Sequence, residues 1–106
     1  MPDDICIVYL KGRLDSAASS GVEQEITDHI AGGRRRMLLD FSELHYVSSI
    51  GLRTVLVAAK RMNAEGGKLV LCSLNPQVAE VFSISGFASI LDIHPTSASA
   101  EAQLTG

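Results

Sequence analysis

The sequence predicts a small α/β domain in which a four-stranded, mostly parallel or mixed sheet carries about four helices. Short apolar runs alternate along the chain with segments whose apolar residues recur at helical spacing. The apolar runs are continuous rather than alternating with polar residues, which is typical of strands buried on both faces. Strand–helix pairs repeated in this way build a sheet with helices packed on it.

The first strand is expected at residues 5–10, where the run ICIVYL is rich in β-branched and aromatic residues. A helix is expected at about 17–31. Asp15 or Ser16 can cap it, because their side-chain oxygens accept hydrogen bonds from the free N–H groups of a first turn. Residues at spacing four form its apolar stripe, namely Val22, Ile26 and Ile30.

The second strand is expected at residues 36–41, before a loop at 42–48 in which Tyr46 and Val47 point inward. The second helix is expected at about 50–64 and ends at a glycine pair. Its apolar positions again follow helical spacing, and they are Leu52, Val55, Leu56, Ala59 and Met62.

The last part of the chain repeats the pattern. A third strand is expected at residues 68–72, a third helix between Pro76 and Gly86, a fourth strand at 89–93 and a short final helix at 97–104. Proline is favourable at the start of a helix, where its missing N–H costs nothing. The buried stripe of the third helix is expected to be Val78, Val81 and Phe82.

The composition indicates one soluble domain that spans residues 1–106. The chain is 46% hydrophobic and 20% charged, which fits a folded protein. Its formal charge is -3, whereas non-specific nucleic-acid binding needs a basic face. The arginines at 34–36 are interpreted as a solvated turn. No signal peptide is visible behind the acidic start MPDDI, and no apolar run approaches the ~20 residues of a membrane helix. We therefore expect a cytoplasmic protein.

The common signatures of catalysis are missing from the sequence. There is no GxGxxG, no GxxxxGK[ST] and no GxSxG, so neither a phosphate-binding loop nor a nucleophile elbow is indicated. The histidines are scattered without partners nearby, at His29, His45 and His94. We expect no enzyme activity and no cofactor.

Three further polar or reactive residues are given structural roles. Cys6 and Cys72 lie inside apolar runs and are expected to be small buried hydrophobic residues rather than metal ligands. Asp40 ends the second strand, and its carboxylate is expected to bond nearby loop amides.

The most informative stretch is DFSELHYVSSIGLR at residues 40–53, where two adjacent serines begin a helix and a glycine follows one residue later. Serines in this place ordinarily cap the helix. A phosphate on one of them would face free N–H groups and the positive end of the helix dipole. The modified protein would stay folded while its surface gained close to two negative charges. The stretch therefore fits either a plain helix cap or a binding switch.

With two flanking stretches, this segment resembles the STAS domain of bacterial anti-sigma-factor antagonists. The family's switch follows a strand that ends in Asp-Leu-Ser or a similar triplet, and it reads Asp-Ser-Ser/Thr-Gly-Leu. KGRLDS at 11–16 resembles the family's Gly-x-Leu-Asp loop, and GGKLVLCSLNPQVAEVFSISGF at 66–87 resembles its third strand and third helix. The resemblance covers roughly residues 5–95.

The resemblance implies that Ser49 is the phosphorylated residue, with Ser48 as the alternative acceptor. Ser48 stands where the family has aspartate, and Ile50 stands where it usually has Ser, Thr or Ala. Gly51 matches the motif, and Asp15 matches a loop aspartate that lies near the switch in the family. The expected partner-binding residues are Asp15, Ser48, Ile50, Gly51 and Arg53.

The family's cycle further implies the partners. The unmodified protein would bind an anti-sigma factor that is also a serine kinase, and phosphorylation of Ser49 from ATP would release it. A serine phosphatase would reset the protein. The alternative is a regulatory STAS subunit of an ABC-type membrane transport complex, which is not phosphorylated. Neither interpretation includes nucleic-acid binding or direct membrane insertion.

The family usually has another strand before the one expected at residues 5–10. Only residues 1–4 precede that strand here. A missing partner strand would leave an open sheet edge, to which a second copy of the chain could pair. Homodimerisation by this route is therefore a hypothesis.

Overall fold

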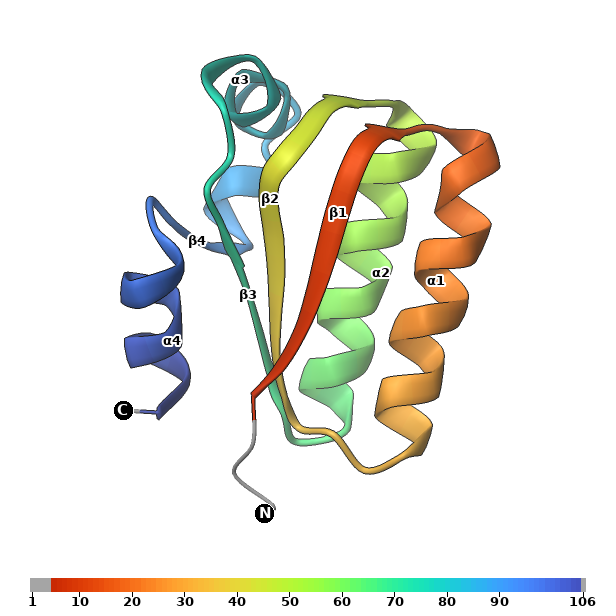
Figure 1. Cartoon of the computed structure of the whole chain (residues 1–106), viewed down its shortest axis with the longest axis vertical. Coiled ribbons are helices and arrows are strands. Elements are labelled where there is room, and N and C mark those ends of the chain that lie inside the picture. The colour runs from red at the N-terminus through yellow and green to blue at the C-terminus, as the bar shows by residue number, and fades with distance from the viewer. Residues whose placement is uncertain (1–4, 106) are drawn as a thin grey trace.

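Residues 5–105 are described by a computed structural model, and within them the chain forms one sheet with helices on both faces (Figure 1). The strands of the described part are β1 Cys6–Leu14, β2 Arg36–Val47, β3 Lys68–Cys72 and β4 Asp92–His94. They are all parallel and lie in the order β1-β2-β3-β4. The predicted α/β class and the four-stranded sheet are confirmed.

The α-helices of the same region are α1 Ser16–Ala31, α2 Ser49–Ala64, α3 Pro76–Ile84 and α4 Ser97–Thr105, and a short 3-10 helix, η1, spans Phe87–Ser89. The helices α1 and α2 lie side by side on one face of the sheet, and α4 lies on the other (Figure 1). The helix α3 lies at the carboxyl end of the sheet. This end also holds the first turns of α1 and α2.

The predicted ends of the first two strands were wrong. β1 runs through the expected loop to Leu14, and β2 runs through its expected loop to Val47. Two register shifts, next to Tyr9 and next to Gly12, let the strands stay paired over this length. Gly12 has a φ of 70°, a conformation that glycine adopts without strain. Tyr46 was expected to point inward, but 42% of it is exposed, since the alternation of the extended strand buries Val47 instead.

The prediction for the region after α3 was only partly right. Gly86, with a φ of 84°, follows α3 and leads into η1, so β4 begins at Asp92 rather than at residue 89. Val78 and Phe82 are buried as expected. Val81 is exposed, because this short helix buries only the face that carries positions four apart.

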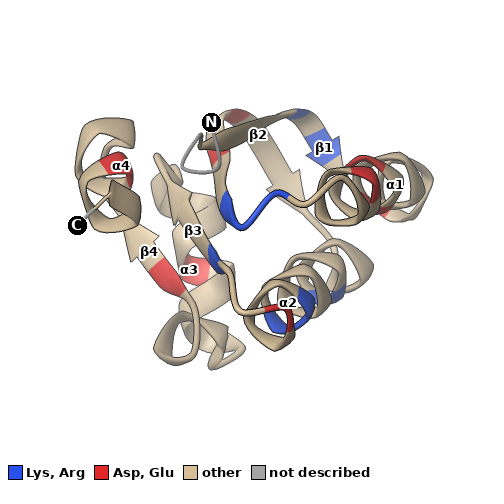
Figure 2. Ribbon diagram, turned by 90° about the horizontal axis from the view of Figure 1, so that it is seen from below, with Lys and Arg blue, Asp and Glu red and all other residues tan. Residues whose placement is uncertain are grey.

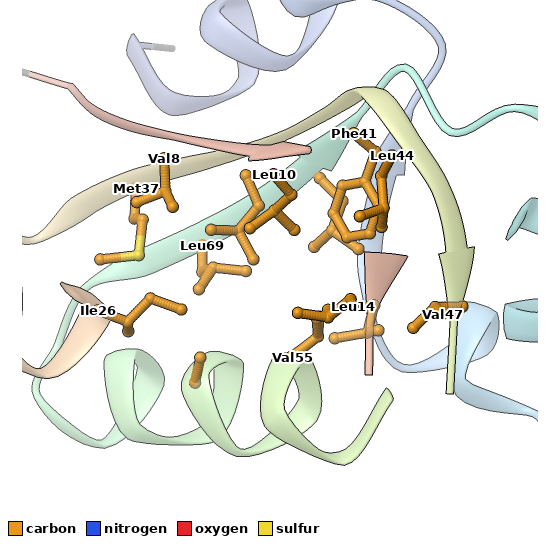
Figure 3. Close-up of a cluster of buried hydrophobic side chains, with 14 of the residues drawn as sticks. Val8, Leu10, Leu14, Ile26, Met37, Phe41, Leu44, Val47, Val55 and Leu69 are labelled. Atoms are coloured by element: carbon orange, nitrogen blue, oxygen red, sulfur yellow. The ribbon is translucent and has the colours of Figure 1, made fainter. Parts of the chain in front are cut away.

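The main core fills the space between the sheet and α1, α2 and α3 (Figure 3). Val8 and Leu10 of β1 face Ile26 of α1 and Val55 of α2 across this layer. A smaller cluster lies beneath α4, and it consists of Leu38, Val70, Cys72, Ala100 and Leu104. The two clusters bury residues 37–39 of β2 and 69–72 of β3 on both faces, as these continuous apolar runs predict.

The structural roles given to the cysteines and to Asp40 are confirmed. Cys6 and Cys72 are buried and unpaired, and burial raises the pKa of both thiols. A thiol that stays protonated is a poor nucleophile and metal ligand. The Asp40 carboxylate accepts a hydrogen bond of 2.8 Å from the Ser42 amide.

Among residues 5–105, no helix combines the length and the apolar character needed to cross a membrane. The same region holds no group of three or more His, Cys, Asp or Glu side chains placed to bind a metal ion.

β1 lies at one edge of the sheet within the described part of the chain. The hypothesis of a missing strand falls on residues 1–4, which lie outside that part. Homodimerisation through this edge stays a prediction. Light scattering that gives the mass of one chain at every concentration would contradict it.

Candidate switch site at the start of α2

The predicted switch lies where the carboxyl ends of β1 and β2 meet the first turns of α1 and α2 (Figure 1). Leu14 and Val47 end the two strands as register partners, and both are buried. Each helix starts within two residues of its strand. The loop that holds Asp15 is thereby brought against the segment that holds the two serines.

Ser48 is the N-cap of α2, and its hydroxyl both accepts and donates a hydrogen bond. The Oγ atom accepts a hydrogen bond from the Gly51 amide at 3.1 Å and donates one to the Leu14 carbonyl at 3.2 Å. The Ser48 amide also donates to the Leu14 carbonyl, at 2.9 Å. Ser48 therefore ties the start of α2 to the end of β1 and takes over the capping role that an aspartate can fill.

Ser49 differs from Ser48 in the exposure and in the hydrogen bonding of its side chain. It is the first residue of α2 and is exposed. Its hydroxyl forms no hydrogen bond with any other residue of the described part of the chain. An enzyme can reach this hydroxyl without opening the helix cap, whereas a phosphate on Ser48 would displace two hydrogen bonds.

Gly51 is the contact point between α2 and β1. A Cβ atom at this position would collide with the Leu14 carbonyl oxygen and lie 2.9 Å from Leu14 Cγ and 3.0 Å from Val47 Cγ2. Glycine is therefore needed here for close approach of two backbones, not for an unusual φ.

Asp15 caps α1 by accepting a hydrogen bond of 3.1 Å from the Ala18 amide. Its other oxygen lies 3.7 Å from Arg13 Nε, and the Arg13 guanidinium stacks over the Tyr46 ring at 4.2 Å. This contact, in which a cation lies over an aromatic face, holds two exposed side chains beside the corner. Arg13 was not among the predicted site residues, and the prediction that Tyr46 points inward was wrong. Only the extended alternation of β1 and β2 brings the two side chains to the same face.

The exposed face of α2 begins at the corner. Ile50 is 52% exposed, and Arg53 is exposed one turn further on. Val57, which the sequence analysis did not include, is 38% exposed and follows Ile50 by seven residues. An apolar residue outside the buried stripe was the signal that could have identified it. We call Ile50, Arg53 and Val57 the outer stripe.

Charge is divided between the two helices that cover this face of the sheet (Figure 2). The basic residues of α2 are Arg53, Lys60 and Arg61, and the helix has no acidic residue. The acidic residues of α1 are Glu23, Glu25 and Asp28. The outer stripe is thus part of a basic helix in a chain with a formal charge of -3.

A shallow groove of about 430 Å³ lies between the second half of α2 and the starts of β3 and β4. Its apolar lining includes Leu56 and Leu69, and Lys60, Lys68 and Asp92 lie along it. None of the predicted switch residues lines this groove.

Replacement of Ser48 by alanine is expected to lower the free energy of unfolding by about 1 kcal/mol, because the first turn of α2 loses its cap. Ser49→Ala is the matched control and should leave stability nearly unchanged, because its hydroxyl makes no such bond. Urea denaturation of both variants measures the difference. Equal stabilities would mean that Ser48 is not the cap.

The fold and the capped serine corner define a small α/β domain with a solvent-facing hydroxyl at a helix start. The STAS domain family model matches residues 1–100, and the chain belongs to the STAS family. BtrV of Bordetella bronchiseptica, a candidate anti-sigma factor antagonist, is 45% identical over 91 residues, which cover 86% of this chain and 78% of BtrV. The anti-sigma F factor antagonist of Paenibacillus polymyxa is 29% identical, over 94% of this chain and 86% of its own length.

Two solved structures of SpoIIAA, the phosphorylated one from Bacillus, have the same fold. The unphosphorylated form of this anti-sigma factor antagonist superimposes with a TM-score of 0.83 at 24% identity, covering 98% of this chain and 90% of SpoIIAA. The phosphorylated form gives a TM-score of 0.73 at 22% identity, covering 96% and 92%. The match with both forms confirms the predicted fold.

Proposed function

We propose that the chain is an anti-sigma-factor antagonist that changes partners when Ser49 is phosphorylated. The observation that carries the proposal is that the two adjacent serines differ in hydrogen bonding and in exposure to solvent. Ser48 holds the helix start through two hydrogen bonds of its hydroxyl, while the neighbouring Ser49 hydroxyl is exposed and forms no hydrogen bond with residues 5–105. BtrV and the Paenibacillus relative, both described as antagonists, support the assignment.

In this cycle the unmodified chain binds an anti-sigma factor in the cytoplasm and thereby frees a sigma factor. The anti-sigma factor is itself a serine kinase that transfers a phosphate from ATP to Ser49. A serine phosphatase removes it again. The chain is the ligand and the substrate in these steps and has no catalytic role or cofactor of its own.

The contact surface comprises Asp15, Ser48, Ile50, Gly51 and Arg53. Ile50 supplies exposed apolar area and Arg53 supplies charge, while Ser48 and Gly51 shape the corner. A phosphate on Ser49 adds close to two negative charges in the middle of this surface. It lies at the positive end of α2, so the fold tolerates the modification while the interface does not.

Recovery of the bound partner tests the proposal. The tagged chain is purified from its native cell, and the proteins that accompany it are identified by mass spectrometry. An ATPase of the histidine-kinase-like type is the expected partner, and Ser49→Ala should retain it. Recovery of a transporter ATPase subunit instead would contradict the proposal and favour a regulatory subunit of an ABC-type transport complex.

A further inference from the structure

We propose that Arg53 binds two anions in turn: an acidic side chain of the partner while Ser49 is free, and the phosphate of Ser49 once it is modified. This inference rests on the proposed function and adds an intramolecular step to it. Phosphorylation would then add negative charge to the interface and also withdraw the cation that the partner uses.

The spacing of the two residues fits an ion pair within the helix. Ser49 is the first residue of α2 and Arg53 follows four positions later, so both lie on the same side of the helix, one turn apart. An anion placed N-terminal to a cation at this spacing is the favourable order. A guanidinium can also bind a phosphate through two parallel hydrogen bonds.

Arg53 is available for this role. It is exposed, and within the described part of the chain its guanidinium forms no hydrogen bond and no ion pair. The helix α2 contains no carboxylate that would compete for it. An exposed arginine without an internal partner, between two exposed apolar residues, fits an external acidic group flanked by apolar surface.

The neighbouring cations are already engaged or too distant. Arg13 lies against Asp15 and the Tyr46 ring, and Arg61 donates a hydrogen bond of 2.7 Å to Thr27 Oγ1. Lys60 follows Ser49 by eleven positions, which is roughly 16 Å along a helix axis. Among the cations of α2, Arg53 is therefore the one that lies a single turn from a phosphate on Ser49.

The phosphate half of the proposal is tested on the full chain with phosphoserine incorporated at position 49 during translation. A pH titration followed by phosphorus NMR gives the second pKa of the phosphate. A nearby guanidinium favours the dianion and lowers this pKa, so Arg53→Gln should raise it by roughly 0.2–0.4 unit. Lys60→Gln on the same helix is the matched control and should leave it unchanged.

The claim that Arg53 binds the phosphate would be overturned if Arg53→Gln left the second pKa of the phosphate unchanged. It would also be overturned if Lys60→Gln raised this pKa as much as Arg53→Gln does. The incorporated phosphoserine makes the test independent of any kinase. A chain that is never phosphorylated in its cell would contradict the proposed function and leave the titration result standing.

The partner half is tested with the unmodified chain and the anti-sigma factor recovered with it. Arg53→Gln should weaken binding about five- to tenfold, and Lys60→Gln should have little effect. The weakening should shrink at high salt, because an exposed ion pair is screened. Unchanged affinity in Arg53→Gln would overturn this half.

Discussion

Ser49→Asp should lower the affinity of the chain for its anti-sigma factor by about 100-fold, because a negative charge that faces an acidic group of the partner across an interface costs several kcal/mol. The carboxylate carries one negative charge where a phosphate carries close to two, so the variant represents a partial switch. Ser49→Ala should keep wild-type affinity, because the Ser49 hydroxyl forms no hydrogen bond within the described part of the chain. Isothermal titration calorimetry measures all three affinities.

Ser49→Asn separates the charge of aspartate from its size. It should bind within a few-fold of the wild-type chain, since it has the shape of aspartate without the charge. The aspartate variant should also be at least as stable as wild type, because a carboxylate in the first turn of α2 faces the positive end of the helix dipole. Equal affinity for Ser49→Asp and Ser49→Asn would refute the electrostatic switch.

Gly51→Ala should destabilise the fold by about 2–3 kcal/mol, which is typical of overpacking at a tight backbone contact. The added methyl group would meet the Leu14 carbonyl oxygen, which is the acceptor that holds Ser48. Relief of the clash requires α2 to move away from the end of β1. We therefore expect lower stability in thermal and urea denaturation, together with weaker partner binding.

Gly21→Ala is the matched control, because Gly21 also lies inside a helix. A Cβ atom at Gly21 would meet nothing within 4 Å. Alanine should stabilise α1 by up to ~1 kcal/mol, since glycine is a poor helix former. The same substitution is thus expected to have opposite effects at the two positions. Destabilisation of similar size in both variants would show that close packing at Gly51 is not the cause.

The elements that the sequence predicted best are those with a strong local signal. β3 was predicted at residues 68–72 and is observed there, because the apolar run KLVLC lies between two glycines and a proline-started helix. The start of α1 was predicted to within one residue, and of the two candidate caps, Asp15 and Ser16, it is Asp15 that caps the helix. Apolar periodicity and capping residues are local features of the sequence, so they can be recognised without knowing which distant segments pack together.

The errors arose where tertiary contacts decide the structure. The polar segment 42–47 has no strand-like run, and it is extended only because β1 pairs with it past two register shifts. Tyr46 was misplaced for the same reason, and the stacking of Arg13 on it could not be found from spacing. In this region the pairing of β1 with β2 determines the extended conformation, although residues 42–47 have only a weak intrinsic preference for a strand.

The position of the candidate site was predicted from the sequence, but the separate roles of its residues were not. The family resemblance placed the phosphate on Ser49 and left Ser48 as the alternative acceptor. Only the structure distinguishes a partly buried cap, bonded to Leu14 and Gly51, from an exposed neighbour with a free hydroxyl. The requirement for glycine at position 51 likewise appears only once Leu14 lies against it.

Site-resolved phosphopeptide mass spectrometry on the chain from its native cell tests the central claim most directly. The wild-type chain is compared with Ser49→Ala and Ser48→Ala under several growth conditions. We expect a phosphate on Ser49 that disappears in Ser49→Ala and persists in Ser48→Ala. A phosphate on Ser48 in the wild-type chain, or an unmodified chain under every condition, would contradict it.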